Sequence, residues 1–250
     1  VCAAGISPSG SVHIGNFRDI ATSYYVVRAL QKMGKKARLL FSWDEFDRLR
    51  KVPSNIAAIT DGFEKYLGMP YAEIPDPHGV YSSYAEYNEK EFEKSLEELD
   101  IHPDYRYQAK QYTANRYADG IVFALKNRKQ IYDILLKYKT QEENAEDREK
   151  YAPVNVYCSA CHKDMTEVIS VSDDGEQLTY RCKVCGKEET INVREYGHVK
   201  LVWKVDWPMR WGVEGVDFEP GGIDHAAASG SYVVACDVAK NIFGVEPPLF

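Results

Sequence analysis

Four of the six cysteines form two pairs that could bind a metal ion. Two residues separate Cys158 from Cys161 and Cys182 from Cys185, and twenty residues separate the pairs. Two residues between thiolates allow a tight turn that directs both sulfurs at one ion, which is typical of structural zinc sites. The alternatives are free thiols or a redox-active pair. We expect a structural Zn²⁺ ion held by all four cysteines, with no open position for water.

His162 lies beside the first pair but is not expected to be a ligand, because four sulfurs already complete a tetrahedral site. The β-like segment around the cysteines has a thin core of its own, and metal binding couples directly to folding in such segments. We therefore predict that a chelator loosens residues 154 to 193.

A second candidate for chemistry is the segment from Pro8 to Asn16, which lies in the turn between an expected strand and an expected helix. In a parallel sheet, such a turn presents backbone N–H groups and the positive end of the helix to a ligand. His13 and Asn16 lie one helical turn apart, so both could reach a phosphate or an adenine edge. The alternative is an ordinary helix start with a buried histidine. The glycines do not have the Gly-x-Gly-x-x-Gly spacing of dinucleotide-binding proteins.

The elements that position this turn form a strand–helix–strand unit. Residues 1 to 6 resemble a strand end, and apolar residues then recur at helical spacing from Ile20 to Leu30. Gly34 ends the helix, and residues 37 to 41 resemble a buried strand. This order predicts the start of a parallel α/β sheet.

Later segments alternate between helical and β-like patterns. The expected elements are an acidic helix from Ser82 to Leu99, a short strand from Arg106 to Gln108, one or two helices from Asn115 to Tyr138, short strands around a turn at Asp173–Gly175, a strand from Val199 to Val205, and a helix from Ala226 to Phe243. We expect a nucleotide-binding α/β domain at 1–150, a zinc-binding insertion at 151–195, and the second part of the α/β domain at 196–250.

Composition limits the class of protein. The 250 residues are 44% hydrophobic and 28% charged, with no apolar run long enough to span a bilayer and no export signal. The net charge of −7 argues mildly against a protein that coats nucleic acid. Two Cys-x-x-Cys pairs and two further cysteines do not fit a secreted disulfide scaffold, so we expect a reducing, cytoplasmic setting. The chain begins with Val1 in an apolar segment, and we expect it to be a fragment.

A signature motif and five further blocks of sequence carry a family resemblance. His13-Ile14-Gly15-Asn16 resembles the His-Ile-Gly-His signature of class I aminoacyl-tRNA synthetases, and the class I lysyl-tRNA synthetases tolerate asparagine at the last position. Asn16 can still donate a hydrogen bond to phosphate but carries no charge. The chain is similar to class I lysyl-tRNA synthetases from end to end, over Gly5–Gly10, Gly15–Arg18, Ser42–Pro53, Val205–Trp211 and Gly222–His225.

The resemblance implies a Rossmann-like parallel sheet with an inserted zinc-binding subdomain. It also implies a lysine–tRNA ligase, whose partners are ATP with Mg²⁺, L-lysine and tRNA(Lys). The second class I signature, Lys-Met-Ser-Lys-Ser, has no match, and the anticodon-binding half of the family is missing. We therefore expect this chain to bind lysine or its adenylate but to turn over poorly.

Site residues are carried over from the family position by position. His13 and Asn16 are the expected catalytic residues, which stabilise charge on the phosphates. The residues expected to bind ATP are Ser9, Gly10, His13, Gly15, Asn16, Gly222 and Asp224. The residues expected to bind the amino acid or its adenylate are Gly5, Ser7, Asp44, Trp203, Trp207 and His225.

Plainer roles remain open for several of these residues. Asp44 and Asp224 could cap helices, and tryptophans often serve only as core. Pro208 lacks an N–H and so argues against a continuous helix through Trp203, Trp207 and Trp211, and we expect Arg210 to pair with Asp206. Three cations after Asp47 could be a solvated face: Arg48, Arg50 and Lys51. The rival functions are another class I synthetase, such as a glutamyl or cysteinyl enzyme, and a non-catalytic zinc ribbon that binds nucleic acid.

Overall fold

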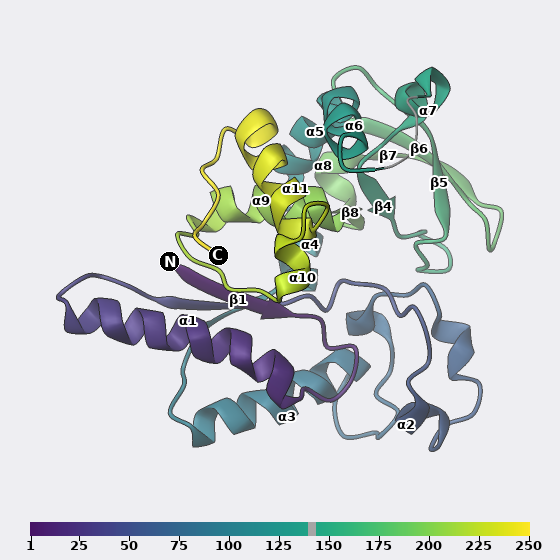
Figure 1. Ribbon diagram of the computed structural model, residues 1–250. Coiled ribbons are helices and arrows are strands. Elements are labelled where there is room, and N and C mark those ends of the chain that lie inside the picture. The colour runs from purple at the N-terminus through teal and green to yellow at the C-terminus, as the bar shows by residue number, and fades with distance from the viewer. Residues whose placement is uncertain (140–143) are drawn as a thin grey trace. The chain divides into compact units, whose positions relative to one another are not determined.

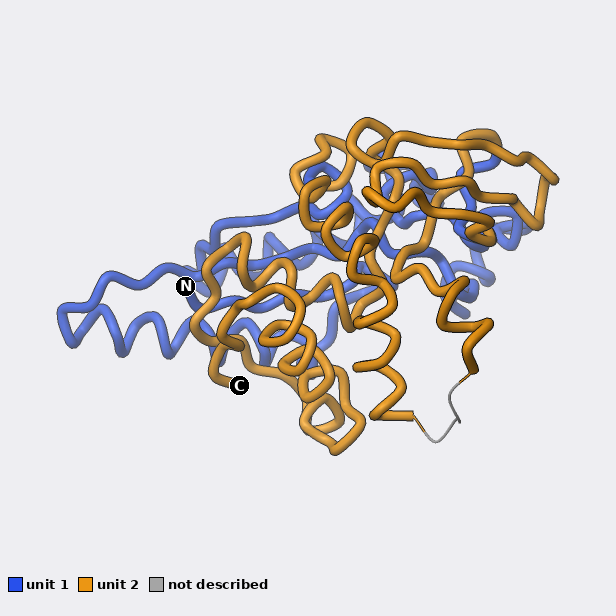
Figure 2. The backbone as a smooth tube through the Cα atoms, turned by 90° about the horizontal axis from the view of Figure 1, so that it is seen from above, with its two compact units in different colours: residues 1–111, 161–164 blue, residues 112–160, 165–250 orange. Residues whose placement is uncertain are grey.

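The computed structural model describes residues 1–139 and 144–250 (Figure 1). The backbone divides into two compact units, coloured separately in Figure 2. Unit 1 comprises residues 1–111 with the short segment 161–164, and unit 2 comprises residues 112–160 and 165–250. The expected boundaries at 150 and 195 stay a prediction.

Unit 1 is built on a parallel sheet in the order β1-β2-β3. Strands β1 (Cys2–Ile6), β2 (Leu39–Trp43) and β3 (Asp104–Tyr107) pair in register, with Ile6 opposite Trp43 and Trp43 opposite Tyr107. Their carboxyl ends therefore meet at one edge of the sheet. The strand–helix–strand expectation is confirmed, because helix α1 (Ile14–Lys32) connects β1 to β2.

The second strand lies two residues later than expected. Its apolar side chains stay buried as far as Trp43, although Ser42 interrupts the apolar pattern in the sequence. At the other end, Arg38 lies outside the strand and pairs with Asp104 at 2.9 Å. Burial rather than the local pattern therefore sets the limits of β2.

Helices α1 and α3 (Tyr84–Glu98) cover one face of this sheet (Figure 1). The ring of Phe92 lies 6.5 Å from Phe17 of α1 and 5.9 Å from Phe41 of β2. The Ser23 hydroxyl donates a hydrogen bond to the Ala3 carbonyl at 2.6 Å, inside the core. Both crossovers thus pack on the same side of the sheet.

The connection from β2 to α3 is irregular and has its own core. It contains α2 (Ser54–Ala57), η1 (Phe63–Tyr66) and η2 (Tyr71–Glu73), and helix α4 (Gln108–Thr113) follows β3. The apolar residues buried together here are Leu49, Ile56, Phe63, Tyr71, Ile74, Tyr84 and Ala85. This cluster holds the segment after β2 in a fixed shape.

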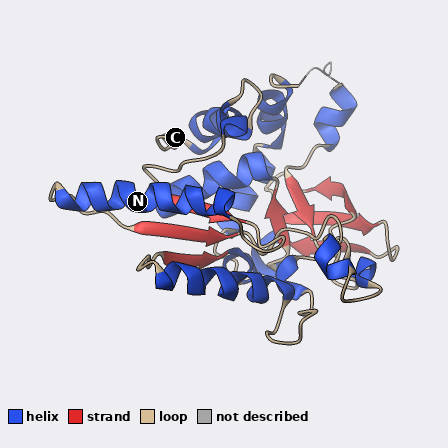
Figure 3. Ribbon diagram, turned by 60° about the horizontal axis from the view of Figure 1, so that its bottom comes forward, coloured by secondary structure: helices blue, strands red, loops and turns tan. Residues whose placement is uncertain are grey.

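Unit 2 contains two antiparallel sheets, drawn in red with helices in blue in Figure 3. One pairs β4 (Val154–Val156) with β8 (Val199–Leu201), and the other has the order β5 (Thr166–Val171), β6 (Gln177–Cys182), β7 (Glu188–Asn192). The helical elements are α5 (Ala118–Lys126), α6 (Arg128–Leu136), α7 (Ala145–Lys150), α8 (Val193–Tyr196), α9 (Trp203–Glu214), α10 (Ile223–Ala226), α11 (Ser231–Val238) and η3 (Ala239–Phe243).

Two expectations for the C-terminal part were wrong. The strand expected over 199–205 ends at Leu201, and α9 continues through Pro208. Burial of Trp207 and Trp211 on either side of Pro208 outweighs the hydrogen bond that proline cannot donate. The helix expected over 226–243 is interrupted after α10, where Gly230 lies so close to the His225 carbonyl that a Cβ would be 2.3 Å from its oxygen.

Within residues 1–139 and 144–250, every helix is too short or too polar to cross a bilayer.

Candidate functional site

His13 caps the first turn of α1 with its side chain. The backbone N–H of Gly15 donates to His13 Nδ1 at 3.1 Å, and the N–H groups of Asn16 and Phe17 donate to the His13 carbonyl. Because Nδ1 accepts a hydrogen bond, the proton of the neutral ring is on Nε2. The ring is exposed, so Nε2–H is available as a donor. The alternative of a buried histidine at this position is wrong.

Gly15 leaves room for this ring. A Cβ at residue 15 would lie 2.8 Å from Cε1 and 2.9 Å from Nδ1 of His13, so a side chain there would displace the imidazole. Gly10, the other glycine of the segment, has open space within 4 Å of the position that a Cβ would take. Of the two glycines, only Gly15 is required by contacts within the described residues.

Three contacts fix the loop between β1 and α1. The Ser7 hydroxyl donates to Asp47 Oδ2 at 2.8 Å, the Tyr84 hydroxyl donates to the Ser9 carbonyl at 2.9 Å, and the Asn88 amide lies 3.5 Å from the Pro8 carbonyl. Burial raises the pKa of Tyr84 to about 12, so the phenol keeps the proton that it donates. Sequence reasoning had no signal for Tyr84 or Asn88, because α3 lies about eighty residues farther along the chain.

Gly5 and Asp44 lie at the carboxyl ends of neighbouring strands. A Cβ on Gly5 would lie 3.0 Å from the Ser42 carbonyl oxygen, so glycine permits the close approach of β1 and β2. Asp44 is buried, and its N–H donates to the Ile6 carbonyl at 2.9 Å. No helix follows Asp44 directly, because Glu45 and Phe46 form a turn and the next helix begins only at Ser54, so the helix-cap alternative for Asp44 is wrong.

Two buried carboxyl groups lie beside this edge. Glu45 accepts hydrogen bonds from the N–H groups of Gln108 and Ala109, at 2.8 and 2.9 Å, and so binds the start of α4. Burial and the nearby Glu89 carboxyl raise the pKa of Glu45 to about 8. Burial and the charge of Glu93 raise the pKa of Glu89 to about 7. The acidic character of α3 is therefore not limited to a solvated face.

In unit 2, the aromatic residues expected to bind substrate lie together. The rings of Trp203 and Trp207 stack with centroids 4.9 Å apart, and the His225 ring meets Trp207 edge-on at 5.7 Å. The indole N–H groups of Trp207 and Trp211 donate to one oxygen of Glu219, at 2.9 and 2.8 Å. Glu219, which sequence reasoning missed, thus fixes the orientation of the Trp207 ring.

A buried ion pair supports this aromatic cluster. Arg210 Nε lies 3.3 Å from Asp206 Oδ2, as expected, and the Arg210 guanidinium lies over the Trp203 ring at 5.2 Å. The Tyr112 hydroxyl donates to the other oxygen of Asp206. Both carboxylate oxygens of Asp206 therefore have a partner, and the Trp203 ring contacts an indole and a cation.

The two glycines before α10, Gly221 and Gly222, differ in how closely other atoms approach them. A Cβ on Gly221 would lie 2.6 Å from the Phe250 ring, whereas Gly222 faces open space and precedes the helix as its N-cap. Asp224 is exposed inside α10, so the alternative that Asp224 caps this helix is wrong. The roles of Gly222, Asp224 and His225 toward a ligand stay predictions.

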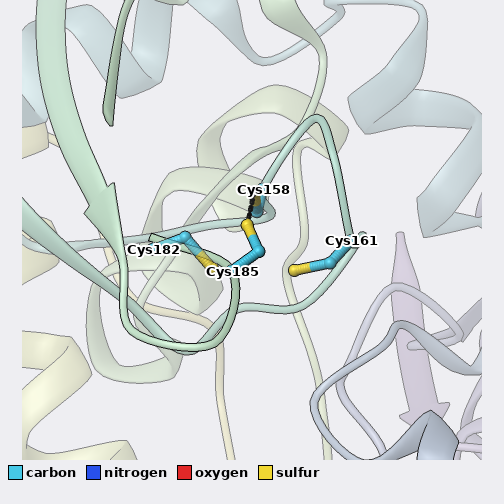
Figure 4. Close-up of side chains that lie close together, drawn as sticks. All are labelled: Cys158, Cys161, Cys182 and Cys185. Atoms are coloured by element: carbon cyan, nitrogen blue, oxygen red, sulfur yellow. Dashed lines mark hydrogen bonds between the residues drawn. The ribbon is translucent and has the colours of Figure 1, made fainter. Parts of the chain in front are cut away.

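The four cysteine sulfurs lie within 4.8 Å of one another (Figure 4). Cys158 Sγ and Cys185 Sγ are 3.6 Å apart. A tetrahedron with Zn–S bonds of about 2.3 Å has sulfur–sulfur edges of about 3.8 Å, so the arrangement fits a Zn²⁺ ion. His162 stands outside the cluster, with its Nδ1 2.8 Å from Glu73 Oε2.

The predicted site residues fall into two sets, one in each unit. Unit 1 holds Gly5, Ser7, Ser9, Gly10, His13, Gly15, Asn16 and Asp44, and unit 2 holds Trp203, Trp207, Gly222, Asp224 and His225. Whether both sets bind one ligand stays a prediction.

A family model and individual relatives of this chain point to the same family. The family model described as "tRNA synthetases class I (K)" matches residues 1–250. A lysine–tRNA ligase of Treponema pallidum is 44% identical over 248 residues, which are 99% of this chain and 46% of that protein. The lysine–tRNA ligase of Pyrococcus horikoshii is 41% identical over 249 residues, covering 100% of this chain and 46% of its own length.

A more distant relative has the same name. The lysine–tRNA ligase of Streptomyces coelicolor is 36% identical over 277 residues, covering 100% of this chain and 48% of the relative. The chain therefore spans about half the length of the curated relatives that it matches.

Proposed function

The chain belongs to the class I tRNA synthetases for lysine, and on this premise we propose that the protein is a lysine–tRNA ligase. It activates L-lysine with ATP to lysyl-adenylate and transfers the lysyl group to tRNA(Lys). The observation that carries the proposal is His13, whose ring caps α1 through Nδ1 and leaves Nε2–H exposed beside the positive end of the helix.

In the activation step, a lysine carboxylate oxygen attacks the α-phosphorus of ATP, and the bond to the bridging oxygen of the pyrophosphate breaks. His13 Nε2–H and the Asn16 side-chain amide donate to phosphate oxygens, where negative charge develops. Mg²⁺, when bound with ATP, neutralises part of the phosphate charge. No covalent intermediate on the enzyme is needed, because positioning and charge stabilisation supply the catalysis.

In the transfer step, a ribose hydroxyl of the terminal tRNA adenosine attacks the carbonyl carbon of the adenylate, and AMP leaves. Ser9, Gly10, Gly15, Gly222 and Asp224 are the further residues that we assign to ATP. The geometry that supports this assignment is the fixed path of the loop from Ser7 to Ser9.

Selection of lysine is assigned to an aromatic and acidic set. Indole rings such as those of Trp203 and Trp207 can attract an ammonium group, and the Arg210 guanidinium, 5.2 Å from the centre of the Trp203 ring, is one cation already held in this way. Gly5, Ser7, Asp44 and His225 complete the proposed set for the amino acid and its adenylate. The orientation of Trp207 by Glu219 supports a role for this ring beyond core packing.

The four cysteines are assigned to a structural Zn²⁺ ion. Their sulfurs join the loop after β4 to the end of β6 and the turn that follows it, and the ion supplies folding energy there rather than chemistry. We also propose a reducing, cytoplasmic location, because such a compartment keeps cysteine thiols reduced.

The test is calorimetry with non-hydrolysable aminoacyl-adenylate analogues. We expect the lysyl compound to bind at least tenfold more tightly than the glutamyl and cysteinyl compounds, which is about 1.4 kcal/mol. Tighter binding of either competitor would assign the chain to another class I synthetase. Zinc binding without affinity for any adenylate analogue would favour the zinc-ribbon alternative and overturn the proposed function.

A further inference from the structure

A basic pocket lies beside the loop between β1 and α1. It has a volume of about 540 Å³ and lies wholly in unit 1. The loop contributes Ser7 and Ser9, and the segment after β2 contributes three cations, Arg48, Arg50 and Lys51. Asp47 is the single carboxylate among the lining residues. The local charge is therefore positive in a chain whose net charge is −7.

Two of these cations are available for a ligand. Arg48 pairs with the buried Asp164 at 3.2 Å, which anchors the segment. Asp47 accepts the Ser7 hydroxyl and so ties the segment to the loop. Within the described part of the chain, neither Arg50 nor Lys51 forms an ion pair, and both are exposed. An anion could therefore bind them without breaking an existing ion pair.

The pocket adjoins the proposed ATP-binding loop and shares Ser9 with it. His13 and Asn16 are not among its lining residues, whereas Ser9 is. The Tyr84 hydroxyl holds the Ser9 carbonyl, and the Leu49 backbone bonds with Gly68 and Met69. Both walls are thus fixed in advance of ligand binding, which lowers the entropic cost of binding.

We propose that this pocket binds backbone phosphates of the single-stranded 3′ end of the RNA substrate, an inference that rests on the proposed function. Its volume suits a ligand of nucleotide size. The Arg50 guanidinium can bind a phosphate through two N–H groups, and Lys51 adds a point charge. ATP is the other source of phosphate, and the experiment separates the two.

The experiment measures binding of the 250-residue chain to a fluorescein-labelled RNA hairpin with a four-nucleotide single-stranded 3′ tail. The same hairpin without the tail is the reference, and anisotropy is followed from 50 to 200 mM salt. ATP binding is measured by calorimetry. The test variant carries Arg50→Ala with Lys51→Ala, and the matched control removes two exposed cations elsewhere in unit 1, Lys35→Ala with Lys36→Ala.

We expect the test variant to bind the tailed hairpin about tenfold more weakly. Its salt slope should be shallower by about 1.4, since each phosphate contact to a single strand contributes about 0.7. The control variant, the untailed hairpin and ATP binding should be unaffected. The exchange Arg50→Lys with Lys51→Arg keeps both charges and should retain most of the salt slope, which a folding defect would not allow.

If the test variant binds ATP more weakly but binds RNA as the parent chain does, the pocket binds ATP phosphates and the proposal is overturned. If the test and control variants lose RNA affinity equally, the loss results from the change in net charge, and the proposal is also overturned. The proposed function fails separately, if the lysyl-adenylate analogue is not preferred while tail-dependent RNA binding persists.

Discussion

At the scale of single residues, the distance from Gly15 to the His13 ring leads to the first prediction. The substitution Gly15→Ala adds helix propensity worth up to about 1 kcal/mol, but its methyl group would collide with the imidazole. We expect unchanged or higher stability in urea and about tenfold weaker binding of the lysyl-adenylate analogue. Ile14→Ala, at an 80% exposed neighbour, is the control. Equal losses for both variants would show that the His13 ring is not involved.

The carboxyl pair of Glu45 and Glu89 leads to a prediction about pH. Their pKa values are raised to about 8 and about 7, from ordinary values near 4.5. Between pH 4.5 and pH 8, the folded chain therefore binds more protons than the unfolded chain, and the free energy of unfolding falls as the pH rises. The substitution Glu89→Gln removes one of the two titrating carboxyl groups, and it also removes the charge that repels the Glu45 carboxylate. At pH 8 we expect it to stabilise the chain by on the order of 1 kcal/mol, and at pH 5 by much less.

Urea unfolding at pH 5, 6.5 and 8 checks this pH dependence. The control is Glu91→Gln on the same helix, whose carboxylate pairs with Lys94 at the surface. A surface pair contributes little at any of these pH values, so this control should follow the parent chain. If Glu89→Gln keeps the full loss of stability from pH 5 to pH 8, the carboxyl pair is not its cause.

At the scale of secondary-structure elements, the turn between β5 and β6 leads to the third prediction. Gly175 has φ +72°, and a Cβ there would lie 2.7 Å from the Val122 carbonyl oxygen of α5. Gly34 has φ +76° at the end of α1 but no neighbour within 4 Å. Gly34→Ala should cost about 1 kcal/mol for its backbone conformation alone. Gly175→Ala should cost about 2 to 4 kcal/mol in urea unfolding, because the hairpin must also move. Equal costs would show that the contact with α5 is unimportant.

Elements were predictable from sequence where a short segment determines its own shape. The β1–α1–β2 unit follows from local periodicity and a terminating glycine, and Cys158 to Cys185 follow from ligand spacing. Contacts between distant segments were not predictable. Nothing near Ser9 in the sequence indicates Tyr84, and nothing near Trp207 indicates that the Glu219 carboxylate accepts its N–H. Pro208 misled the prediction, because propensity is a weaker term than burial of the neighbouring tryptophans.

At the scale of the whole molecule, the proposed nucleotide loop and the cysteine cluster depend on different sets of contacts. The proposed nucleotide loop depends on contacts within unit 1, from Asp47, Tyr84 and Asn88. Three of the four cysteines lie in unit 2, next to the sheet β5-β6-β7. That sheet buries few apolar side chains, chiefly Leu178, Tyr180 and Ile191, so the metal should supply much of its stability.

This distribution predicts how far the effect of chelation reaches. Removing zinc should raise amide hydrogen exchange in β5, β6 and β7 by about tenfold or more, while β1 and β2 keep their protection. Peptide-resolved exchange with and without a chelator measures this, and zinc added back should reverse it. Cys182→Ser should reproduce the effect of the chelator. Cys236→Ser, at a cysteine outside the four-sulfur cluster, should retain one zinc ion per chain and normal exchange. Equal loss of protection in β1 and β2 would mean that the ion stabilises the fold as a whole, and unchanged exchange in β5 to β7 would mean that the four sulfurs need no metal.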